Sequence, residues 1–400
     1  MLRGIFIADI HIGAMSYEDT KTMLSYFKET MKEYTKEDLL DFIVIGGDFF
    51  DKQLYNNDPY IVIALKMMLC ILHSAKVVRV VGGTSSHDAN QYQLYTVLIE
   101  ELSKGLDMVK YDFKVIQTVS EEELFPGVNV LYLPEEYIFD QDEYYKEFFE
   151  KKGYYDYVFG HGVIQEAMRY AKRESGKKGE KLKRKAAVFN SAELSSICKG
   201  KVYFGHYHIY TNIKDKVFYS GSYCRWCFGE EDEKGFLYLT CNPKKEIYNE
   251  IFVINDKALK YNTLAYGYKD SVFESTEEME NEAAFILESK KTYDIDYLRI
   301  IFNIPVGYEH PDVLIDFFRN RFKDDKTIRL EFSNGYVENK KKASRDTSTM
   351  SEDTKIILDK NIPEETKIAY FLKQRLQVEM SEEKIKKYLE LDKQEENRNG

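Results

Sequence analysis

Two histidines separated by a single residue, His206 and His208, follow the apolar run Val-Tyr-Phe and Gly205. In extended backbone, residues i and i+2 point to the same side, so both imidazoles can face one point in space. The pair by itself fits two surface histidines at a strand end as well as it fits a metal centre. The other histidines favour the metal centre, because five of the seven lie at the ends of strand-like runs: His11, His87, His161, His206 and His208.

Carboxylates stand at the ends of two further apolar runs. Asp9 ends LRGIFIAD, and Asp48 ends FIVIGGD. Imidazoles combined with carboxylates suit divalent transition metals such as manganese, iron or zinc. Two such ions, bridged most simply by Asp48, can activate a water and neutralise charge on a phosphoryl group undergoing in-line attack. The sequence therefore predicts a two-metal site for hydrolysis of phosphate esters.

Alternating strands and helices must position these residues. Nearly all-apolar strands, separated by helices, are typical of an α/β domain whose sheets are covered on both faces. Sites in such domains lie at the strand ends. The expected strands cover 2–8, 42–48, 76–83, 112–118, 128–133, 155–161 and the run before His206, and the expected helices cover 17–34, 58–73 and 90–103. The later runs GFLYLTC and EIYNEIFVI are expected to pair antiparallel and close the domain.

The length of 400 residues allows two or three domains. We expect an α/β domain over 1–256, a smaller α+β domain over 257–335, a polar linker over 336–360 and a helical segment over 361–400. Apolar residues four apart in that last segment fit helices that pack on each other as well as helices that bind a partner.

The overall charge and the apolar runs limit the cellular setting. A net charge of −11 argues against a chain that coats nucleic acid by bulk electrostatics, but it leaves room for a local basic patch. No apolar run approaches the roughly 18 residues of a membrane span. Five scattered cysteines indicate a reducing compartment, so a cytoplasmic protein is expected.

The motifs occur in a recognisable order. D-I-H, GGD, HD, GH and GHYH follow one another over roughly residues 1–240, and this series resembles the calcineurin-like metallophosphoesterases. The run YSGSYCRWCFGE followed by KGF is similar to the SbcD-type DNA-repair and recombination nuclease subunits, a branch that includes the nuclease of large phages. The resemblance implies a four-layer metallophosphoesterase sandwich with a smaller α+β cap domain and a C-terminal helical arm.

The same resemblance implies an activity and partners. The chain would be a metal-dependent DNA exonuclease or endonuclease subunit that acts with an SbcC-type coiled-coil ATPase, as a homodimer, in the host cytoplasm if the chain is viral. Two alternatives remain open at this point. One is a phosphoesterase of the same fold that acts on a small molecule or a phosphoprotein, and the other is a catalytically weakened DNA-binding scaffold.

Site residues carry over from the family only where its motifs match. One ion, expected to be manganese, would be held by Asp9, His11, Asp48 and His208, and a second by Asp48, His161 and His206. His87 would act as general acid, oriented by Asp88. The family's Gly-Asn-His-Asp, whose Asn holds the second metal, reads Gly-Thr-Ser-Ser-His-Asp here, so Ser86, Thr84 or water would replace the amide. The occupancy of the second metal site is thereby left open.

A basic segment and a cysteine pair each have both a structural and a functional interpretation. Residues 169–185 contain nine Lys and Arg against two Glu, which fits a solvated loop as well as a DNA-phosphate contact through Lys181, Lys183, Arg184 and Lys185. The Cys224–Cys227 pair has no second CxxC to complete a zinc site, so incidental thiols are expected.

Overall fold

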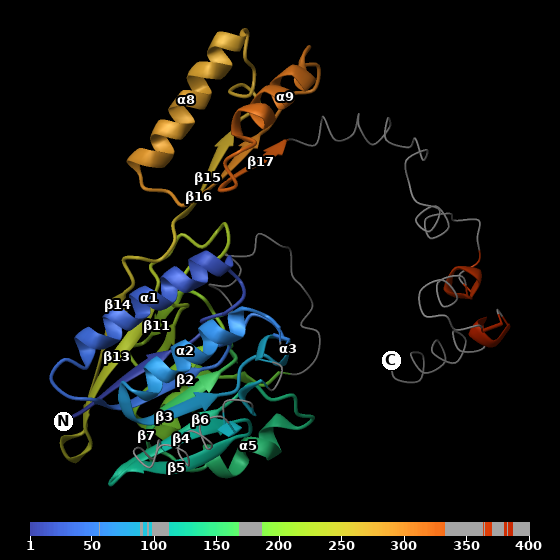
Figure 1. Ribbon diagram of the computed structural model, residues 1–400. Helices are drawn as coiled ribbons and strands as arrows, with labels where there is room; N and C mark the ends of the chain where they lie inside the picture. Colours follow the sequence, from blue (N-terminus) through green and yellow to red (C-terminus); the bar gives the residue numbers. More distant parts are fainter. Residues whose placement is uncertain are drawn as a thin grey trace. The chain divides into compact units, whose positions relative to one another are not determined.

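The computed structural model describes 1–55, 57–88, 91–93, 96–97, 112–167, 186–332 and, in the tail, 363, 365–369, 380–381 and 383–386. The chain divides into two compact units. The larger unit contains 1–265, 274–301 and 316–331, and the other contains 266–273, 302–315 and 332–400. Helices alternate with strands of mixed sheets, which confirms the predicted α/β class (Figure 1).

The first large sheet has six strands, of which the central ones run parallel. In spatial order they are β14 (Ile247–Ile254), β13 (Gly235–Asn242), β1 (Leu2–Ile7), β2 (Leu40–Gly46), β3 (Ala75–Val81) and β4 (Asp112–Ile116). β1 to β4 pair parallel, whereas β13 pairs antiparallel with both β1 and β14. The predicted antiparallel closure by GFLYLTC and EIYNEIFVI is confirmed.

The second large sheet also has six strands with a parallel centre. In spatial order they are β11 (Tyr210–Ile213), β12 (Val217–Ser220), β10 (Cys198–Gly205), β7 (Tyr155–His161), β6 (Val128–Leu133) and β5 (Ser120–Phe125). β12, β10, β7 and β6 pair parallel, and the two edge strands pair antiparallel. A short parallel pair, β8 (Val163–Ile164) and β9 (Val188–Phe189), follows β7 in the chain.

The alternation of side chains along β1 explains why both faces of the first sheet are buried. Phe6 belongs to a cluster shared with the second sheet and stacks on Phe159 of β7 at 5.6 Å. Ile5 and Ile7 point the other way, into a cluster with Phe27 of a helix. Because successive side chains of a strand alternate between faces, a doubly covered strand must be apolar throughout.

Helices cover the outer faces of both large sheets. α1 (Tyr17–Tyr34) and α2 (Tyr60–Leu72) pack on the first sheet, and α5 (Gln141–Phe149) and α7 (Ser191–Ile197) pack on the second. α1 begins where the Ser16 side chain accepts a hydrogen bond from the Asp19 N–H, and it buries Met23, Phe27 and Met31 along one stripe. The described residues also form two short helices, α3 (Ser85–Asp88) and the 3-10 turn η1 (Pro243–Lys245).

A three-stranded sheet comes after β14 in the chain. Its strands are β15 (Tyr261–Tyr266), β16 (Tyr297–Phe302) and β17 (Ile328–Phe332), and its helices are α8 (Thr276–Thr292) and α9 (Pro311–Phe322). α9 begins at Pro311, where the missing backbone N–H of proline leaves no helical hydrogen bond unmade. The predicted boundary at residue 256 remains a prediction.

Several expectations are confirmed and others fall elsewhere. The helix predicted over 17–34 matches α1 residue for residue. β5 and β15 were not predicted, since their polar residues interrupt any apolar run. Most of the helix expected over 90–103, the linker 336–360 and most of the tail lie outside the described residues.

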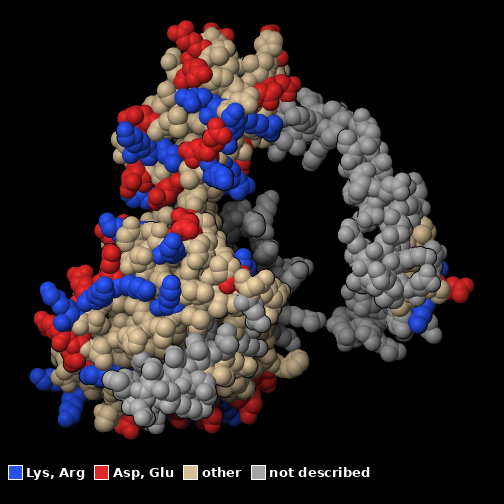
Figure 2. Space-filling model, viewed as in Figure 1, with Lys and Arg blue, Asp and Glu red and all other residues tan. Residues whose placement is uncertain are grey.

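The described surface carries both signs of charge. On the face shown in Figure 2, lysine and arginine side chains are interspersed with aspartate and glutamate. Among the described residues, no helix combines the length and apolar character needed to cross a membrane.

Candidate metal centre

The structure brings the six predicted ligands together at one end of the two large sheets. Asp9 and His11 follow β1, Asp48 follows β2, His161 ends β7, and His206 and His208 follow β10. All four strands belong to the parallel parts of their sheets. The carboxyl ends of parallel strands meet at one edge, which explains how residues far apart in the sequence reach one site.

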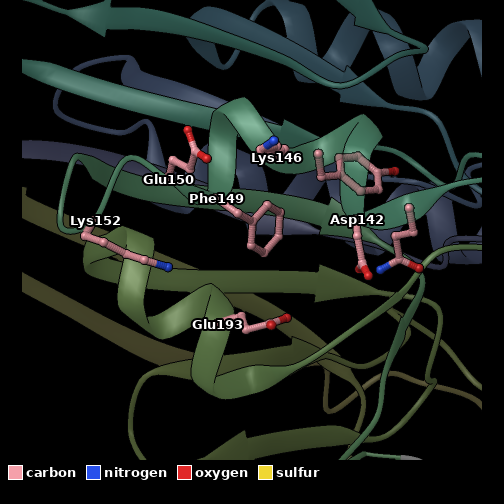
Figure 3. A pocket seen from close by; sticks show the side chains of 8 residues that line it. Asp142, Lys146, Phe149, Glu150, Lys152 and Glu193 are labelled. Carbon is pink, nitrogen blue, oxygen red and sulfur yellow. The ribbon is translucent and has the colours of Figure 1, made fainter.

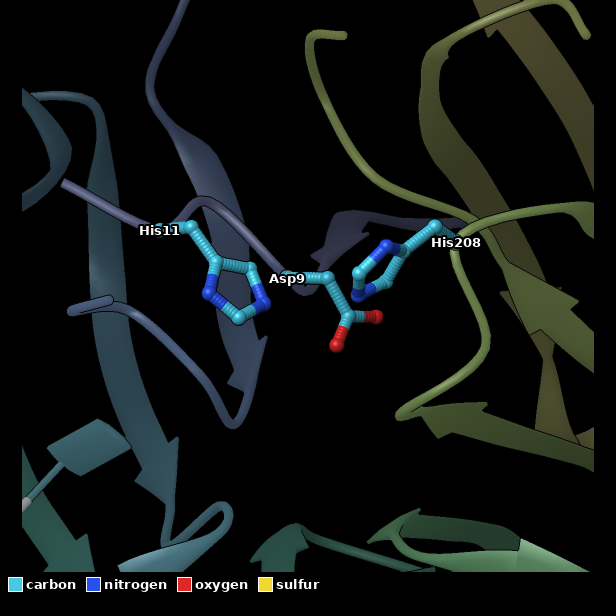
Figure 4. A group of neighbouring side chains, drawn as sticks. All are labelled: Asp9, His11 and His208. Carbon is cyan, nitrogen blue, oxygen red and sulfur yellow. The ribbon is translucent and has the colours of Figure 1, made fainter. Parts of the chain in front are cut away.

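The first group consists of Asp9, His11 and His208. One ligand atom from each lies within 4.8 Å of the other two, and the Asp9 carboxylate lies between the two imidazoles (Figure 4). The backbone N–H of His206 donates to both oxygens of Asp9 at 3.0 Å, which fixes the carboxylate. Two imidazoles and one carboxylate are a suitable ligand set for a divalent transition metal.

The second group consists of Glu135, His161 and His206, with ligand atoms again within 4.8 Å of one another. Sequence reasoning found both histidines and missed Glu135. A usable signal existed, because Glu135 stands two residues beyond the end of β6. Asp9 has the same offset from β1, and Asp48 has it from β2.

Asp48 lies between the two groups. Its Oδ2 is 3.7 Å from Nε2 of His11 and 3.4 Å from Nε2 of His161. One oxygen of one carboxylate therefore faces a histidine from each group. This is the position that a bridging ligand requires.

The backbone is strained where it carries these ligands. Asp9, His11, Asp48 and His206 have positive φ angles of 51°, 50°, 48° and 109°. Such angles are uncommon outside glycine and cluster at functional sites. Close approach adds a further constraint, because a Cβ on Gly83 would lie 2.2 Å from the Asp48 nitrogen. Glycine is therefore required beside Asp48.

Hydrogen bonds select which imidazole nitrogen stays free. Nδ1 of His161 lies 2.7 Å from the Gly46 carbonyl, which can only accept, so Nε2 is left as the metal-facing nitrogen. Nδ1 of His208 is held in the same way by the Glu230 carboxylate at 2.9 Å. His11 is buried, and neither of its ring nitrogens has a hydrogen-bond partner among the described residues. Nδ1 of His11 does face Oδ1 of Asp51 at 3.5 Å, and a buried imidazole that lies between carboxylates fits a metal ligand.

Charges within the site shift the pKa values of its members. Burial alone would raise the pKa of Asp48, but His161 outweighs it and holds that pKa below its usual range. Burial likewise opposes charge on His161, yet the Asp48 carboxylate raises the His161 pKa to about 10. Burial also raises the pKa of Glu135, but His206 outweighs burial, so this pKa is lowered overall. Carboxylates that stay ionised at neutral pH are prepared to hold cations.

His87 and Asp88 lie in α3 beside this centre but do not contact each other through the predicted orienting bond. Nδ1 of His87 lies 2.6 Å from the Asp51 carbonyl, which leaves Nε2 to act. The buried Asp88 carboxylate instead accepts from the backbone N–H groups of Gly83 at 2.9 Å and Asp48 at 3.1 Å. Asp88 therefore ties the loops after β2 and β3 together, and the Asp51 carbonyl is the partner that orients His87.

The Gly-Thr-Ser-Ser-His-Asp turn directs Thr84, and not Ser86, toward the candidate ligands. The Thr84 N–H donates to Oδ1 of Asp48 at 2.7 Å, and its hydroxyl is 3.4 Å from Nε2 of His161. Ser86 is exposed on α3. Of the two hydroxyls considered from the sequence, only that of Thr84 reaches the second group.

Trp226 is a further residue that sequence reasoning did not single out. Its ring centroid is 4.5 Å from that of His11 and 4.6 Å from that of His208, so it packs on the first group. It lies inside the YSGSYCRWCFGE segment. Burial raises the pKa of the neighbouring Cys224 thiol to about 12, which makes it inert at neutral pH, and no ligand group found among the described residues includes it.

Two other features lie elsewhere. The predicted DNA contacts Lys181, Lys183, Arg184 and Lys185 fall outside the described residues. A surface groove between α5 and α7, lined by residues such as Tyr145, Phe149 and Glu193, contains none of the ligands (Figure 3). The candidate ligands therefore gather at the strand ends and not in this groove.

Comparisons with known proteins found no match, because neither a family description nor a curated protein matches the chain.

Proposed function

We propose that this chain is a metal-dependent DNA nuclease of the SbcD type, which hydrolyses phosphodiester bonds during DNA end processing, repair or recombination. The observation that carries the proposal is the position of Asp48 between two imidazole–carboxylate groups. His206 and His208 are the ligands whose side chains remain open to solvent, 28% and 27% exposed, so a phosphodiester can approach the centre from their side.

The residues present fit two divalent ions, for which manganese is proposed. Asp9, His11, Asp48 and His208 would hold one, and Asp48, His161 and His206 would hold part of the shell of the other. Such ions supply charge neutralisation and water activation for in-line attack. His87 is proposed to donate a proton from Nε2 to the leaving oxygen, because the Asp51 carbonyl occupies Nδ1.

The finer architecture belongs to the same proposal. Two six-stranded sheets that share an aromatic cluster, with helices on both outer faces, support a four-layer metallophosphoesterase sandwich. A cap over 257–335 and a helical arm over 361–400 complete the proposed domain plan. Fold alone would license no activity, and it is the ligand set that selects hydrolysis.

Comparing substrates tests the activity. Purified chain with manganese is incubated with linear DNA, a chromogenic phosphodiester and a phosphopeptide, and the isosteric Asp48→Asn variant serves as the control. We expect metal-dependent DNA cleavage that Asp48→Asn abolishes. Hydrolysis of the small ester or phosphopeptide with DNA left intact would favour the phosphoesterase alternative. DNA binding without hydrolysis of any substrate would favour the scaffold.

The proposed partners are DNA, a second copy of the chain and an SbcC-type ATPase. If Lys181, Lys183, Arg184 and Lys185 contact phosphates, replacing all four with Ala reduces the slope of log affinity against log salt by about 0.9 per lost contact. Truncation after Ser351 is expected to leave nuclease activity on short DNA and to abolish co-elution with the ATPase in size-exclusion chromatography. An unchanged salt slope, or persistent co-elution, contradicts the respective contact.

A further inference from the structure

We infer that Glu135 is a ligand of the second metal ion and takes the place of the amide that the Gly-Thr-Ser-Ser-His-Asp turn lacks. This inference rests on the proposed two-metal function and deepens it. It assigns a carboxylate where the motifs supply only a hydroxyl, and it settles which residue completes the ligand set around His161 and His206.

Geometry is the first argument. Oε2 of Glu135 lies 3.4 Å from Nδ1 of His206 and 3.9 Å from Nε2 of His161. Nδ1 of His161 is held by a carbonyl, so the Nε2 that faces Glu135 is the nitrogen left for an ion. The three donors come from three different strand ends and converge on one point.

The structure also holds Glu135 in this orientation. Its backbone N–H donates to the Gly82 carbonyl at 3.1 Å, which ties the end of β6 to the end of β3. The Tyr137 hydroxyl donates to Oε1 at 2.9 Å, so one carboxylate oxygen is engaged and Oε2 remains directed at the histidines. Supports of this kind around a ligand fix its rotamer before a metal arrives.

Charge is the second argument. The Glu135 side chain is only 3% exposed, yet its ion pairs within the described part of the chain are with histidines alone. Because imidazoles bind a metal only in their neutral form, a divalent ion would replace the positive charge of these histidines beside the buried Glu135 carboxylate. Beside Asp9 and Asp48, Glu135 adds one negative charge, which neutralises more of the charge of two divalent ions than a neutral amide would.

Thr84 is the rival ligand. Its hydroxyl lies 3.2 Å from Oε2 of Glu135 and 3.3 Å from Oδ2 of Asp48. Both oxygens are acceptors for the one hydroxyl hydrogen. A hydroxyl that donates to two carboxylates serves as their hydrogen-bond partner. Carboxylate oxygen is also the stronger donor to a hard divalent ion.

Manganese titration of matched variants tests the assignment. Isothermal titration calorimetry of the metal-free full chain measures stoichiometry and affinity, and low-temperature electron paramagnetic resonance detects a spin-coupled manganese pair. The variants are Glu135→Ala, the isosteric Glu135→Gln and Thr84→Val. Glu136→Ala is the control, because the neighbouring carboxylate binds the Val119 N–H and the Tyr144 hydroxyl outside the centre. Thermal unfolding monitors folding of each variant.

We expect wild type and Glu136→Ala to bind two ions and to show the coupled signal. Glu135→Ala should lose the coupled signal and weaken one site by more than the roughly 10–100-fold that follows loss of an outer partner. Glu135→Gln, which keeps a carbonyl oxygen, should weaken that site less, and Thr84→Val should retain it.

Two outcomes distinguish failure of the Glu135 assignment from failure of the proposed function. If wild type binds two ions and both folded Glu135 variants still bind two with affinities within about threefold, or if Thr84→Val alone loses the site, the Glu135 assignment is overturned while the proposed function stands. If the folded wild-type chain binds no manganese, the proposed function is overturned together with the assignment.

Discussion

Oε1 of Glu230 lies 2.9 Å from Nδ1 of His208, on the side of the ring away from the nitrogen left for a metal. The other Glu230 oxygen accepts the Trp226 N–H at 3.1 Å, and the buried Lys234 ammonium lies 3.8 Å from it. Glu230 and His208 form a carboxylate–histidine pair of the kind that orients a metal ligand and makes it more basic.

Glu230→Gln should therefore weaken the first metal site. The amide removes the negative charge behind His208. Its NH₂ group can only donate, so either His208 or the Trp226 backbone N–H loses its acceptor. We expect manganese affinity at one site to fall roughly 10–100-fold in calorimetric titration. Glu231→Gln, the same change at the exposed neighbour, should match wild type. Equal affinities for the two variants would contradict the role of Glu230.

His87→Ala should remove catalysis and leave metal binding. The imidazole is oriented through Nδ1 by the Asp51 carbonyl. It lies in a possible ligand group with His11 and Asp51, and it is absent from the groups of Asp9 with His208 and of Glu135 with His206. General acid help contributes roughly 10²–10⁴-fold to rate, so cleavage of linear DNA should fall by that factor. Manganese titration should still give two sites, and His73→Ala, at an exposed helix end, should be fully active. Retention of more than about a tenth of the activity by His87→Ala would exclude the general acid role.

Metal binding should release a proton from His161. In the metal-free chain, burial opposes the charge but the Asp48 carboxylate raises the His161 pKa to about 10, so the imidazole is protonated at pH 7. A metal must displace this proton, so the apparent affinity of the second site should rise about tenfold per pH unit between pH 6 and 9. Calorimetry in two buffers of different ionisation enthalpy measures the release. Identical heats in both buffers would show that no proton leaves.

Glu122, on the edge strand β5, should make the stability of the fold depend on pH. Burial raises its pKa, but hydrogen bonds from Arg79, Lys114 and Tyr132 outweigh burial and lower the pKa from 4.5 to about 2. A depressed folded-state pKa stabilises the fold fully above pH 4.5, and that contribution is lost as the pH falls through 2. At pH 7 the contribution is about 3 kcal/mol.

Glu122→Gln tests this linkage. Urea unfolding of the metal-free chain should show the variant less stable at pH 7 by about that amount, with the difference reduced to roughly half at pH 3. The exposed Glu123→Gln on the same strand is the control. A difference that stays constant from pH 7 to pH 3 would mean that the effect is packing and not ionisation.

Local patterns in the sequence were sufficient for the α/β class and for naming the six candidate ligands that the structure brings together. An apolar run that ends in Asp or His, as at Asp9, Asp48 and His161, marks both a doubly buried strand and the group it presents, because strand burial and side-chain alternation are local properties. The same reasoning found the helix over 17–34. The tail and Lys181 with its neighbours lie outside the described residues, so the predictions made for them stay predictions.

Only the tertiary structure decided which groups meet. Glu135 reaches His161 and His206 because β6, β7 and β10 are neighbours in one sheet, and strand order is not written in any single strand. The loop after β3 turns Thr84 inward and Ser86 outward, and it gives Asp88 backbone partners in place of His87. These choices depend on contacts between segments dozens of residues apart, so local pattern names the candidate groups and long-range packing selects among them.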